Sequence, residues 1–188
     1  METKVAYFRN SGKENTDAVM NIVRQRTREL GIKTIVVASY RGYTALKAVE
    51  ALNGLRIIVV SGFRDPTPEN LAQGISEEDK RFIESKGGTV YVATHLFSGL
   101  SGAMRKKFNT YVIGDIVAST LRIFGSGLKV TIEMAAMVAD AGIVRTDEDI
   151  IAIGGTGSGA DTAAVIRPAT SSNFFDLKVR EILCKPGL

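Results

Sequence analysis

Glycine and small hydroxyl-bearing residues gather in one stretch of the chain. Residues 150–153 are apolar, residues 154–159 read Gly-Gly-Thr-Gly-Ser-Gly, and Ala160, Asp161 and Thr162 follow. An apolar run that ends in glycines is typical of a buried strand that brings backbone N–H groups to a ligand, because glycine permits a close approach. This composition favours phosphate binding, while a tight structural turn after a strand stays open as the alternative.

Two familiar nucleotide motifs share part of this spacing, and neither fits. Gly155, Gly157 and Ala160 have the spacing of a dinucleotide loop, which needs a helix, a further strand and an acid about 20 residues on. Fewer than thirty residues follow, and they include Pro168. A P-loop needs Lys-Ser/Thr where this chain has Ala160-Asp161. The stretch is therefore predicted to be a wall of a different kind of ligand site.

A second polar loop, residues 39–44, is the better phosphate candidate. Its sequence is Ser-Tyr-Arg-Gly-Tyr-Thr, and it leads from an apolar strand into a helix whose first N–H groups lack helical acceptors. A helix end stabilises an anion by ~0.3–1 kcal/mol and at best about 2 kcal/mol, whereas micromolar binding requires about 8 kcal/mol. A tight ligand must therefore also bury a large organic part. The alternative is that Ser39 and Thr44 only cap the helix.

Aromatic residues near these loops can supply a flat surface for such a ligand, namely Tyr40, Tyr43, Phe63, His95 and Phe97. His95 directly follows a predicted strand, although a lone histidine is more often structural than catalytic. Asp161 is expected to bond its own loop in an Asx turn, with ligand contact left open. Glu133 and Asp140 share a helix face, and each is expected to have structural hydrogen-bond partners. Cys184 is expected to be a packed, structural residue.

The composition excludes several classes of function. One histidine and one cysteine cannot form a common zinc site, and no G-x-S-x-G element supports a Ser-His-Asp hydrolase. A net charge of +4 suits an anionic small molecule and is low for a nucleic-acid partner. No apolar run is long enough for a membrane span, and the N-terminus lacks the apolar core of a signal peptide. With a single cysteine, a cytoplasmic location is expected.

Apolar runs alternate with amphipathic segments throughout the 188 residues, which predicts one α/β domain with helices on both faces of a sheet. We expect strands at 4–8, 34–38, 56–60, 89–93, 150–153, 163–167 and 177–183, and helices at 16–30, 43–52, from 76, at 112–124 and at 129–141. The last two strands are expected to close the sheet antiparallel at one edge. Residues 61–68 and 94–110 are expected to be irregular, and Arg24, Arg26 and Arg28 to form a solvated face.

Residues 36–45 resemble the strand, turn and helix of the pyruvate kinase C-terminal domain, where a similar turn holds the phosphate of a sugar effector. More broadly, the chain is similar to a group of stand-alone archaeal proteins with a pyruvate-kinase-C-terminal-like fold, whose members bind FMN. The segments that carry this resemblance are 7–8, 12–16, 133–135, 139–142, 151–156 and 159–163. It implies a three-layer α/β/α sandwich with a mostly parallel sheet and an antiparallel edge strand.

The resemblance implies an FMN-binding protein without pyruvate kinase activity, since the kinase's catalysis resides in a separate barrel domain. The phosphate is expected at residues 39–44, and the ribityl chain or flavin near the other loops. The predicted cofactor-binding residues are Asn15, Thr16, Ser39, Arg41, Gly42, Tyr43, Thr44, Thr94, His95, Gly155, Thr156, Gly157, Ser158, Gly159, Asp161 and Thr162.

Two other functions stay open: a regulatory or sensor module for a phosphorylated metabolite, and a flavin-dependent oxidoreductase. No catalytic residue and no metal ligand is assigned. The expected partner is a phosphate-bearing small molecule, with no nucleic acid and no membrane. The sequence leaves the oligomeric state open, because residues 94–110 can serve as a lid or complete the site of a second copy.

Overall fold

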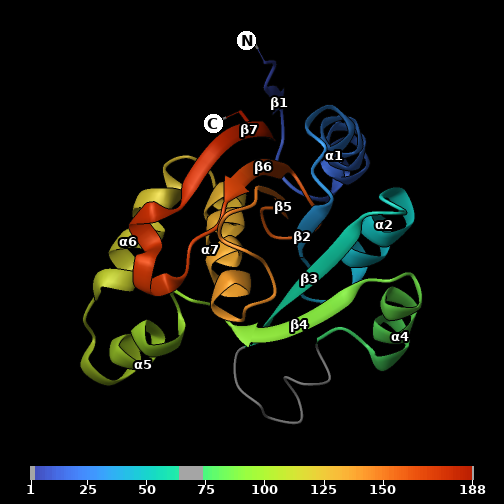
Figure 1. Cartoon of the computed structure of the whole chain (residues 1–188). Coiled ribbons are helices and arrows are strands. Elements are labelled where there is room, and N and C mark those ends of the chain that lie inside the picture. The colour runs from blue at the N-terminus through green and yellow to red at the C-terminus, as the bar shows by residue number, and fades with distance from the viewer. Residues whose placement is uncertain (1–2, 64–73, 188) are drawn as a thin grey trace.

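A computed structural model describes residues 3–63 and 74–187 of the chain and has a seven-stranded sheet at its centre (Figure 1). The spatial order is β1-β7-β6-β5-β2-β3-β4. The strands are β1 (Ala6–Phe8), β2 (Thr34–Ala38), β3 (Arg56–Phe63), β4 (Thr89–Thr94), β5 (Ile150–Gly154), β6 (Thr162–Arg167) and β7 (Lys178–Pro186). Short strands rich in valine and isoleucine suit such a buried sheet.

Helices cover both faces of the sheet, so the predicted three-layer α/β/α sandwich with a mostly parallel sheet is confirmed (Figure 1). One layer holds α1 (Thr16–Leu30), α2 (Tyr43–Ala51) and α4 (Glu77–Ser85). The other holds α7 (Ser126–Asp140), with α6 (Ile113–Arg122) beside it and α5 (Gly99–Phe108) further out. Two 3-10 turns are η1 (Lys13–Asn15) and η2 (Ser171–Asp176). An apolar core lies on each side of the sheet.

The antiparallel strand is not at an edge, which corrects the sequence prediction. β6 runs antiparallel to both β5 and β7, and it lies inside the sheet. The outer position belongs to β1, which pairs parallel to β7 with Ala6 opposite Cys184. The short connection from Gly154 to Thr162 can join only antiparallel neighbours, whereas the pairing of the two ends of the chain leaves no signal in local sequence.

Residues 94–110 are largely helical, which corrects the expectation of a long irregular stretch. Helix α5 follows Ser98 and ends at Asn109, which has a left-handed φ of 48°. Its two glycines, Gly99 and Gly102, weaken the helical signal in the sequence because glycine is a poor helix former. In the expected loop at 61–68, β3 continues to Phe63, and residues 64–68 lie outside the described ranges.

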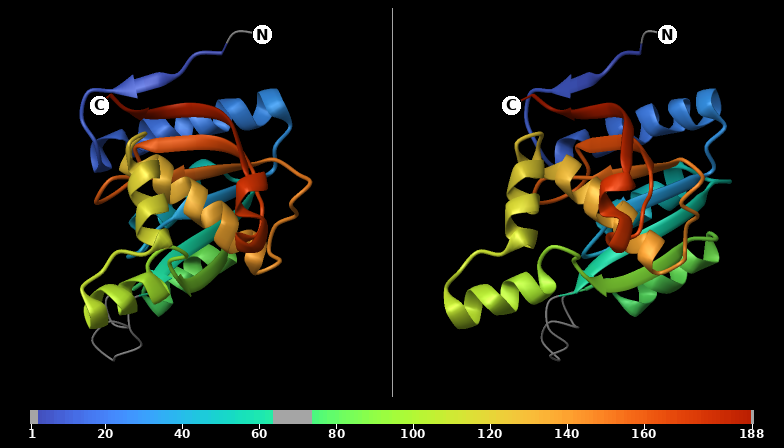
Figure 2. Two further views of the ribbon diagram at one scale, coloured as in Figure 1. Left: turned by 90° about the vertical axis from the view of Figure 1, so that its left-hand side faces the viewer. Right: turned by 60° about the vertical axis from the view of Figure 1, so that its left-hand side comes forward.

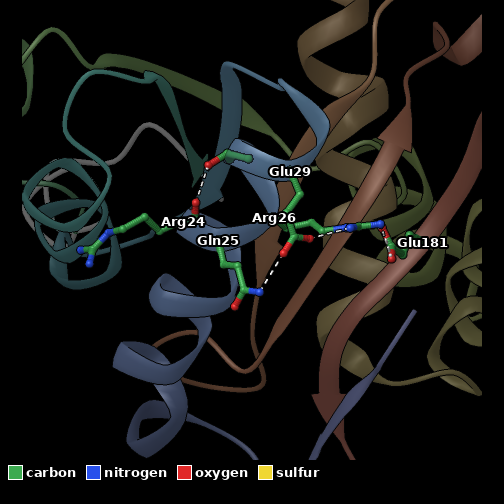
Figure 3. Close-up of polar contacts among 6 residues, drawn as sticks. Arg24, Gln25, Arg26, Glu29 and Glu181 are labelled. Atoms are coloured by element: carbon green, nitrogen blue, oxygen red, sulfur yellow. Dashed lines mark hydrogen bonds and ion pairs between the residues drawn. The ribbon is translucent and has the colours of Figure 1, made fainter. Parts of the chain in front are cut away.

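The three arginines of α1 were expected to form a solvated face, but two of them are partly buried. Arg26 donates to both carboxylate oxygens of Glu181 on β7, at 2.9 and 3.0 Å, and also to Glu29 (Figure 3). Arg24 donates to the carbonyl of Ala51, at the end of α2. Arg28 alone of the three is exposed. These bonds fix α1 against the sheet and against α2.

The carboxyl ends of β2, β3, β4 and β5 meet at one edge of the sheet, because these strands run parallel. From β2 the chain continues to β3 on one side, and from β5 it continues to β6 on the other. Ligands of open α/β sheets bind at such a divergence. None of the helices within residues 3–63 and 74–187 is long and apolar enough to cross a membrane.

Candidate functional site

A cavity of about 500 Å³ lies where the loops after β2 and β5 diverge. Its volume falls within the range of roughly 300–1,000 Å³ that is usual for small-molecule sites. The lining residues come from the two predicted loops, from His95 and from an apolar floor: Ala38, Ser39, Tyr40, Arg41, Tyr43, Thr44, Val60, Gly62, His95, Val130, Met134, Gly155, Gly157, Ser158 and Gly159. The structure thus brings together loops that are over a hundred residues apart in the sequence.

The loop after β2 presents the start of α2 to this cavity. Gly42 precedes the helix with a φ of 89°, a conformation that side-chain-bearing residues rarely adopt. The buried Ser39 hydroxyl accepts a hydrogen bond from the amide of Ala45 at 3.2 Å, so it caps the helix. The amides of Tyr43 and Thr44 belong to the first turn and have no acceptor within the helix. This end of α2 therefore offers N–H donors to an anion.

Two charged side chains that the sequence did not point to lie beside this helix start. The ammonium of Lys13 lies 4.2 Å from the centre of the Tyr43 ring. The second side chain is negatively charged. A Cβ built on Gly42 would be 2.9 Å from Asp79 Oδ2, so a carboxylate of α4 lies against the same turn. The electrostatics at the start of α2 are mixed, with Lys13 and Arg41 opposing Asp79.

The glycine-rich loop has a structural side that faces away from the cavity. Asp161 is completely buried, and its Oδ2 accepts hydrogen bonds from the amides of Gly12 and Thr156 at 2.8 and 3.0 Å. Its Oδ1 accepts from the hydroxyl of Thr162 at 2.7 Å. The bond to Thr156 is the local type that the sequence suggested for Asp161, and the bond to Gly12 ties the loop to the segment after β1.

Other predicted ligand residues serve the same packing. Thr16 Oγ1 accepts from the amide of Ala160 at 3.0 Å and donates to the carbonyl of Lys13 at 2.8 Å. The side-chain amide of Asn15 donates to carbonyls of its own segment. A Cβ on Gly159 would collide with Lys13, so the two segments meet at backbone distance. Seven predicted residues therefore do not line the cavity: Asn15, Thr16, Gly42, Thr94, Thr156, Asp161 and Thr162.

The glycine-rich loop thus combines the two interpretations that the sequence left open. Its glycines let it pack tightly on the segment after β1, as a structural turn would. Its opposite side forms one wall of the cavity through Gly155, Gly157, Ser158 and Gly159. Gly42 and Thr156 adjoin lining residues in the chain without lining the cavity themselves.

Behind His95 lies a buried charged pair that sequence spacing did not identify as part of a site. Glu133 is fully buried on α7, and it forms an ion pair with the nearly buried Lys129 one turn earlier. Its Oε1 accepts a hydrogen bond from the amide of Phe97 at 2.9 Å. His95 Nδ1 lies 3.4 Å from Glu133 Oε2, within ion-pair distance, and no described residue hydrogen-bonds this nitrogen.

The surroundings keep the Glu133 carboxylate ionised. Burial by itself would raise its pKa, but His95, Lys129 and the Phe97 amide outweigh burial and hold the pKa at about 2. The carboxylate therefore attracts the Nδ1 side of His95, whose ring also lines the cavity. The ring of His95 thus has a buried carboxylate on its Nδ1 side and also lines the cavity.

Comparison with known protein families assigns the chain. The model of the family described as pyruvate kinase, alpha/beta domain, matches residues 17–166, which is well over half of the sequence. The chain belongs to this family. The match confirms the fold that the resemblance implied, and it covers β2 to β6 with both loops of the cavity.

One solved structure similar to this pyruvate kinase alpha/beta domain is Cryptosporidium parvum pyruvate kinase in complex with ADP. The identity is 12% and the TM-score 0.44, with 90% of this chain covered. The chain spans 25% of the length of that kinase.

Two further candidates in this alpha/beta domain have ordinary structural roles. Asp140 accepts a hydrogen bond from the amide of Ser171 at 2.7 Å, so it caps η2 and does not meet Glu133. Cys184 is fully buried, and burial raises the pKa of its thiol to about 12, which makes it a poor nucleophile. Within the described residues, no group of three or more His, Cys, Asp or Glu side chains could hold a metal ion.

The position of His95 depends on the absence of a side chain at Gly62. A Cβ there would collide with His95 Nε2, so Gly62→Ala should displace the imidazole from its position beside Glu133. We expect a cost of about 1 kcal/mol in unfolding free energy, at the low end for overpacking, because the ring is partly exposed. NMR of the only histidine should show shifted ring signals, whereas Gly102→Ala on α5 should leave them unchanged. Unchanged ring signals in Gly62→Ala would contradict this geometry.

Proposed function

We propose that the cavity binds FMN, with the phosphate at the start of α2 and the flavin over the apolar floor. The observation that carries this proposal is the meeting of two unlike surfaces in one cavity of about 500 Å³. One end offers N–H and hydroxyl donors, and the floor offers aliphatic side chains. A ligand that suits both must carry a phosphate and a large, flat organic group.

The phosphate end is supported by the first-turn amides of Tyr43 and Thr44, the Thr44 hydroxyl and Arg41. Lys13, on the ring of Tyr43, adds a second cation. Such a helix end contributes at best about 2 kcal/mol, and Asp79 opposes an anion here. The phosphate end alone is therefore too weak to hold a ligand tightly.

The floor supplies what the phosphate end lacks. Val60, Val130 and Met134 lie under the cavity, and Tyr40 and Tyr43 stand at its side. Micromolar binding needs about 8 kcal/mol in total, so on the order of 6 kcal/mol must come from the flavin and ribityl parts. At about 25 cal/mol per Å², burial of roughly 240 Å² of apolar surface is sufficient, before the costs of binding.

The direct test is addition of FMN to the purified protein, followed by flavin fluorescence and thermal unfolding. At a hundredfold excess over Kd, a bound ligand stabilises the fold by about 2.7 kcal/mol. For a chain of this size we expect a rise in Tm of roughly 5–10 °C. A protein that is purified without flavin, and whose Tm does not change with FMN, would refute the proposal.

Single substitutions test where the phosphate binds. Thr44→Ala should weaken FMN binding by roughly five- to tenfold, because the lost hydrogen bond contributes about 1 kcal/mol. Ser158→Ala should have little effect. Asp79→Asn should strengthen binding, because it removes the opposing charge. Gly42→Asp should also weaken binding, but it would strain the backbone and collide with Asp79. Equal losses for Thr44→Ala and Ser158→Ala would contradict the assignment.

Membership of the pyruvate kinase alpha/beta domain family favours a second candidate, a regulatory or sensor module for a phosphorylated metabolite. The same helix start would hold its phosphate, and FMN would be an opportunistic ligand. A sugar phosphate that binds at least tenfold more tightly than FMN would favour this function.

The His95–Glu133 pair favours a third candidate, a flavin-dependent oxidoreductase. In this pair an imidazole with a buried carboxylate 3.4 Å from its Nδ1 lines the proposed flavin cavity. A bound flavin that NAD(P)H does not reduce, and that does not exchange electrons with other reduced partners, would count against this function.

A further inference from the structure

Helix α6 has an apolar stripe that faces solvent. Ile113, Ile116 and Ile123 are exposed to 79%, 62% and 69%, although isoleucine is among the residues most often buried. Together with Thr120, which is also exposed, they are spaced three, four and three residues apart and so lie on one helical face. Within the part of the chain that the structure describes, this face of α6 is thus largely apolar and exposed.

The isoleucine stripe is not the side by which α6 packs on the rest of the domain. The opposite face of α6 is the packed one, where Asp115 and Ala118 are buried. Asp115 pairs with Arg105 of α5, and a Cβ on Gly114 would collide with the hydroxyl of Ser101. The inner side of α6 is therefore packed, while the outer isoleucines stay largely exposed in the single chain.

Further exposed apolar residues lie on and beside these two helices. Tyr111 precedes α6 with 79% exposure, and Phe124 follows it with 54%. On α5, Leu100 and Phe108 are exposed to 81% and 61%. The two helices lie at the periphery on the α7 side of the sheet, away from the helices of the other layer (Figure 2). We refer to these seven exposed residues on or flanking α5 and α6 as the α5–α6 face.

We propose that the α5–α6 face is the interface of a symmetric homodimer, in which it contacts the same face of a second copy. An aromatic side chain buries roughly 150–250 Å², and an aliphatic one somewhat less. At the exposures given above, the accessible surface of the seven side chains together is on the order of 800 Å². That is about the area per partner of a standard stable interface, ~800 Å².

The chemistry of the face fits a second copy. A two-fold axis places a surface against itself, so the surface must be self-complementary. None of the seven side chains is charged, so contact between two copies of the face buries apolar groups, and the exposed cations Lys106, Lys107 and Arg122 lie outside the seven. Isoleucine and aromatic anchors at the centre, with Lys106 and Lys107 exposed on the adjacent turn of α5, match an apolar core with a charged rim.

The proposal is independent of any ligand, and its test uses the protein without FMN. Light scattering during gel filtration should give 40.4 kDa, twice the 20.2 kDa of one chain. The double variant Ile116→Glu/Ile123→Glu should give 20.2 kDa with unchanged circular dichroism, because both side chains are exposed in the single chain. Its Tm should not depend on protein concentration, whereas that of the dimeric wild type should rise with concentration. As a matched control, Tyr7→Glu on β1 removes another exposed apolar group and should remain dimeric.

Three results would overturn the proposal. One is a wild-type chain that is monomeric at all concentrations tested. Another is a dimer that persists in the double glutamate variant, which would place the interface elsewhere. The third is a monomer that binds vesicles of anionic phospholipid through the same isoleucines, since an apolar stripe beside basic residues can also suit a membrane surface.

Discussion

Replacing Glu133 by alanine should lower the free energy of unfolding by roughly 3–5 kcal/mol, the usual cost of removing one partner of a buried ion pair. Lys129 would be left nearly buried without its counter-charge, and the amide of Phe97 would lose its acceptor. Urea unfolding followed by circular dichroism measures this change. Because His95 also loses the carboxylate behind its ring, its NMR signals should shift in the same variant.

The acid dependence of stability provides a second measure of the same contact. The pKa of Glu133 is lowered in the folded state to about 2 from 4.5. Its contribution is therefore complete above pH ~4.5 and is lost as the pH falls from there toward 2. A shift of this size corresponds to about 3 kcal/mol. Glu133→Gln should flatten the acid limb of the stability curve over this range, and an unchanged acid limb would contradict the low pKa.

A double-mutant cycle separates the ion pair from general packing. Lys129→Met alone should also be strongly destabilising, because it leaves Glu133 charged and fully buried. The combination Lys129→Met/Glu133→Gln should recover much of the loss, since no uncompensated charge remains. If the two single effects simply add in the double variant, Lys129 and Glu133 have no coupling energy, and the stabilising role assigned to this ion pair is wrong.

The strands and most helices could be predicted because their signals are local. β2 and β5 are short apolar runs rich in valine and isoleucine, and their predicted ranges agree closely with the structure. The position of β6 could not be predicted, because it depends on the pairing of β1 with β7 from opposite ends of the chain. Helix α5 was missed because its glycines resemble a loop composition.

The location of the candidate site could be predicted, because it follows from where the parallel strands end. Parallel strands bring the loops after β2 and β5 to one edge, and the cavity lies there. Sequence could not assign directions to side chains within those loops. Asp161 and Ser158 belong to one polar loop, yet Asp161 faces the core and Ser158 faces the cavity. Lys13 was missed because its approach to Tyr43 is a tertiary contact.

Replacing Asp161 by asparagine should destabilise the fold by roughly 2–4 kcal/mol, although the side chain keeps its shape. The carboxylate accepts three hydrogen bonds in a fully buried place, two of them from the amides of Gly12 and Thr156. An amide group has only one acceptor oxygen, so its NH₂ would face a donor on one side. Hydrogen bonds to a charged group contribute about 1.5–3 kcal/mol each, and an unsatisfied buried donor is costly.

The matched control is Asp140→Asn, which makes the same change at an exposed carboxylate with one amide donor. Its cost should stay below about 1 kcal/mol. Because Asp161 also ties the glycine-rich loop to the segment after β1, its replacement should loosen the wall of the cavity and weaken FMN binding, whereas Asp140→Asn should not. If Asp161→Asn kept full stability but lost FMN binding, Asp161 would contact the ligand directly, and the structural role assigned to it would be wrong.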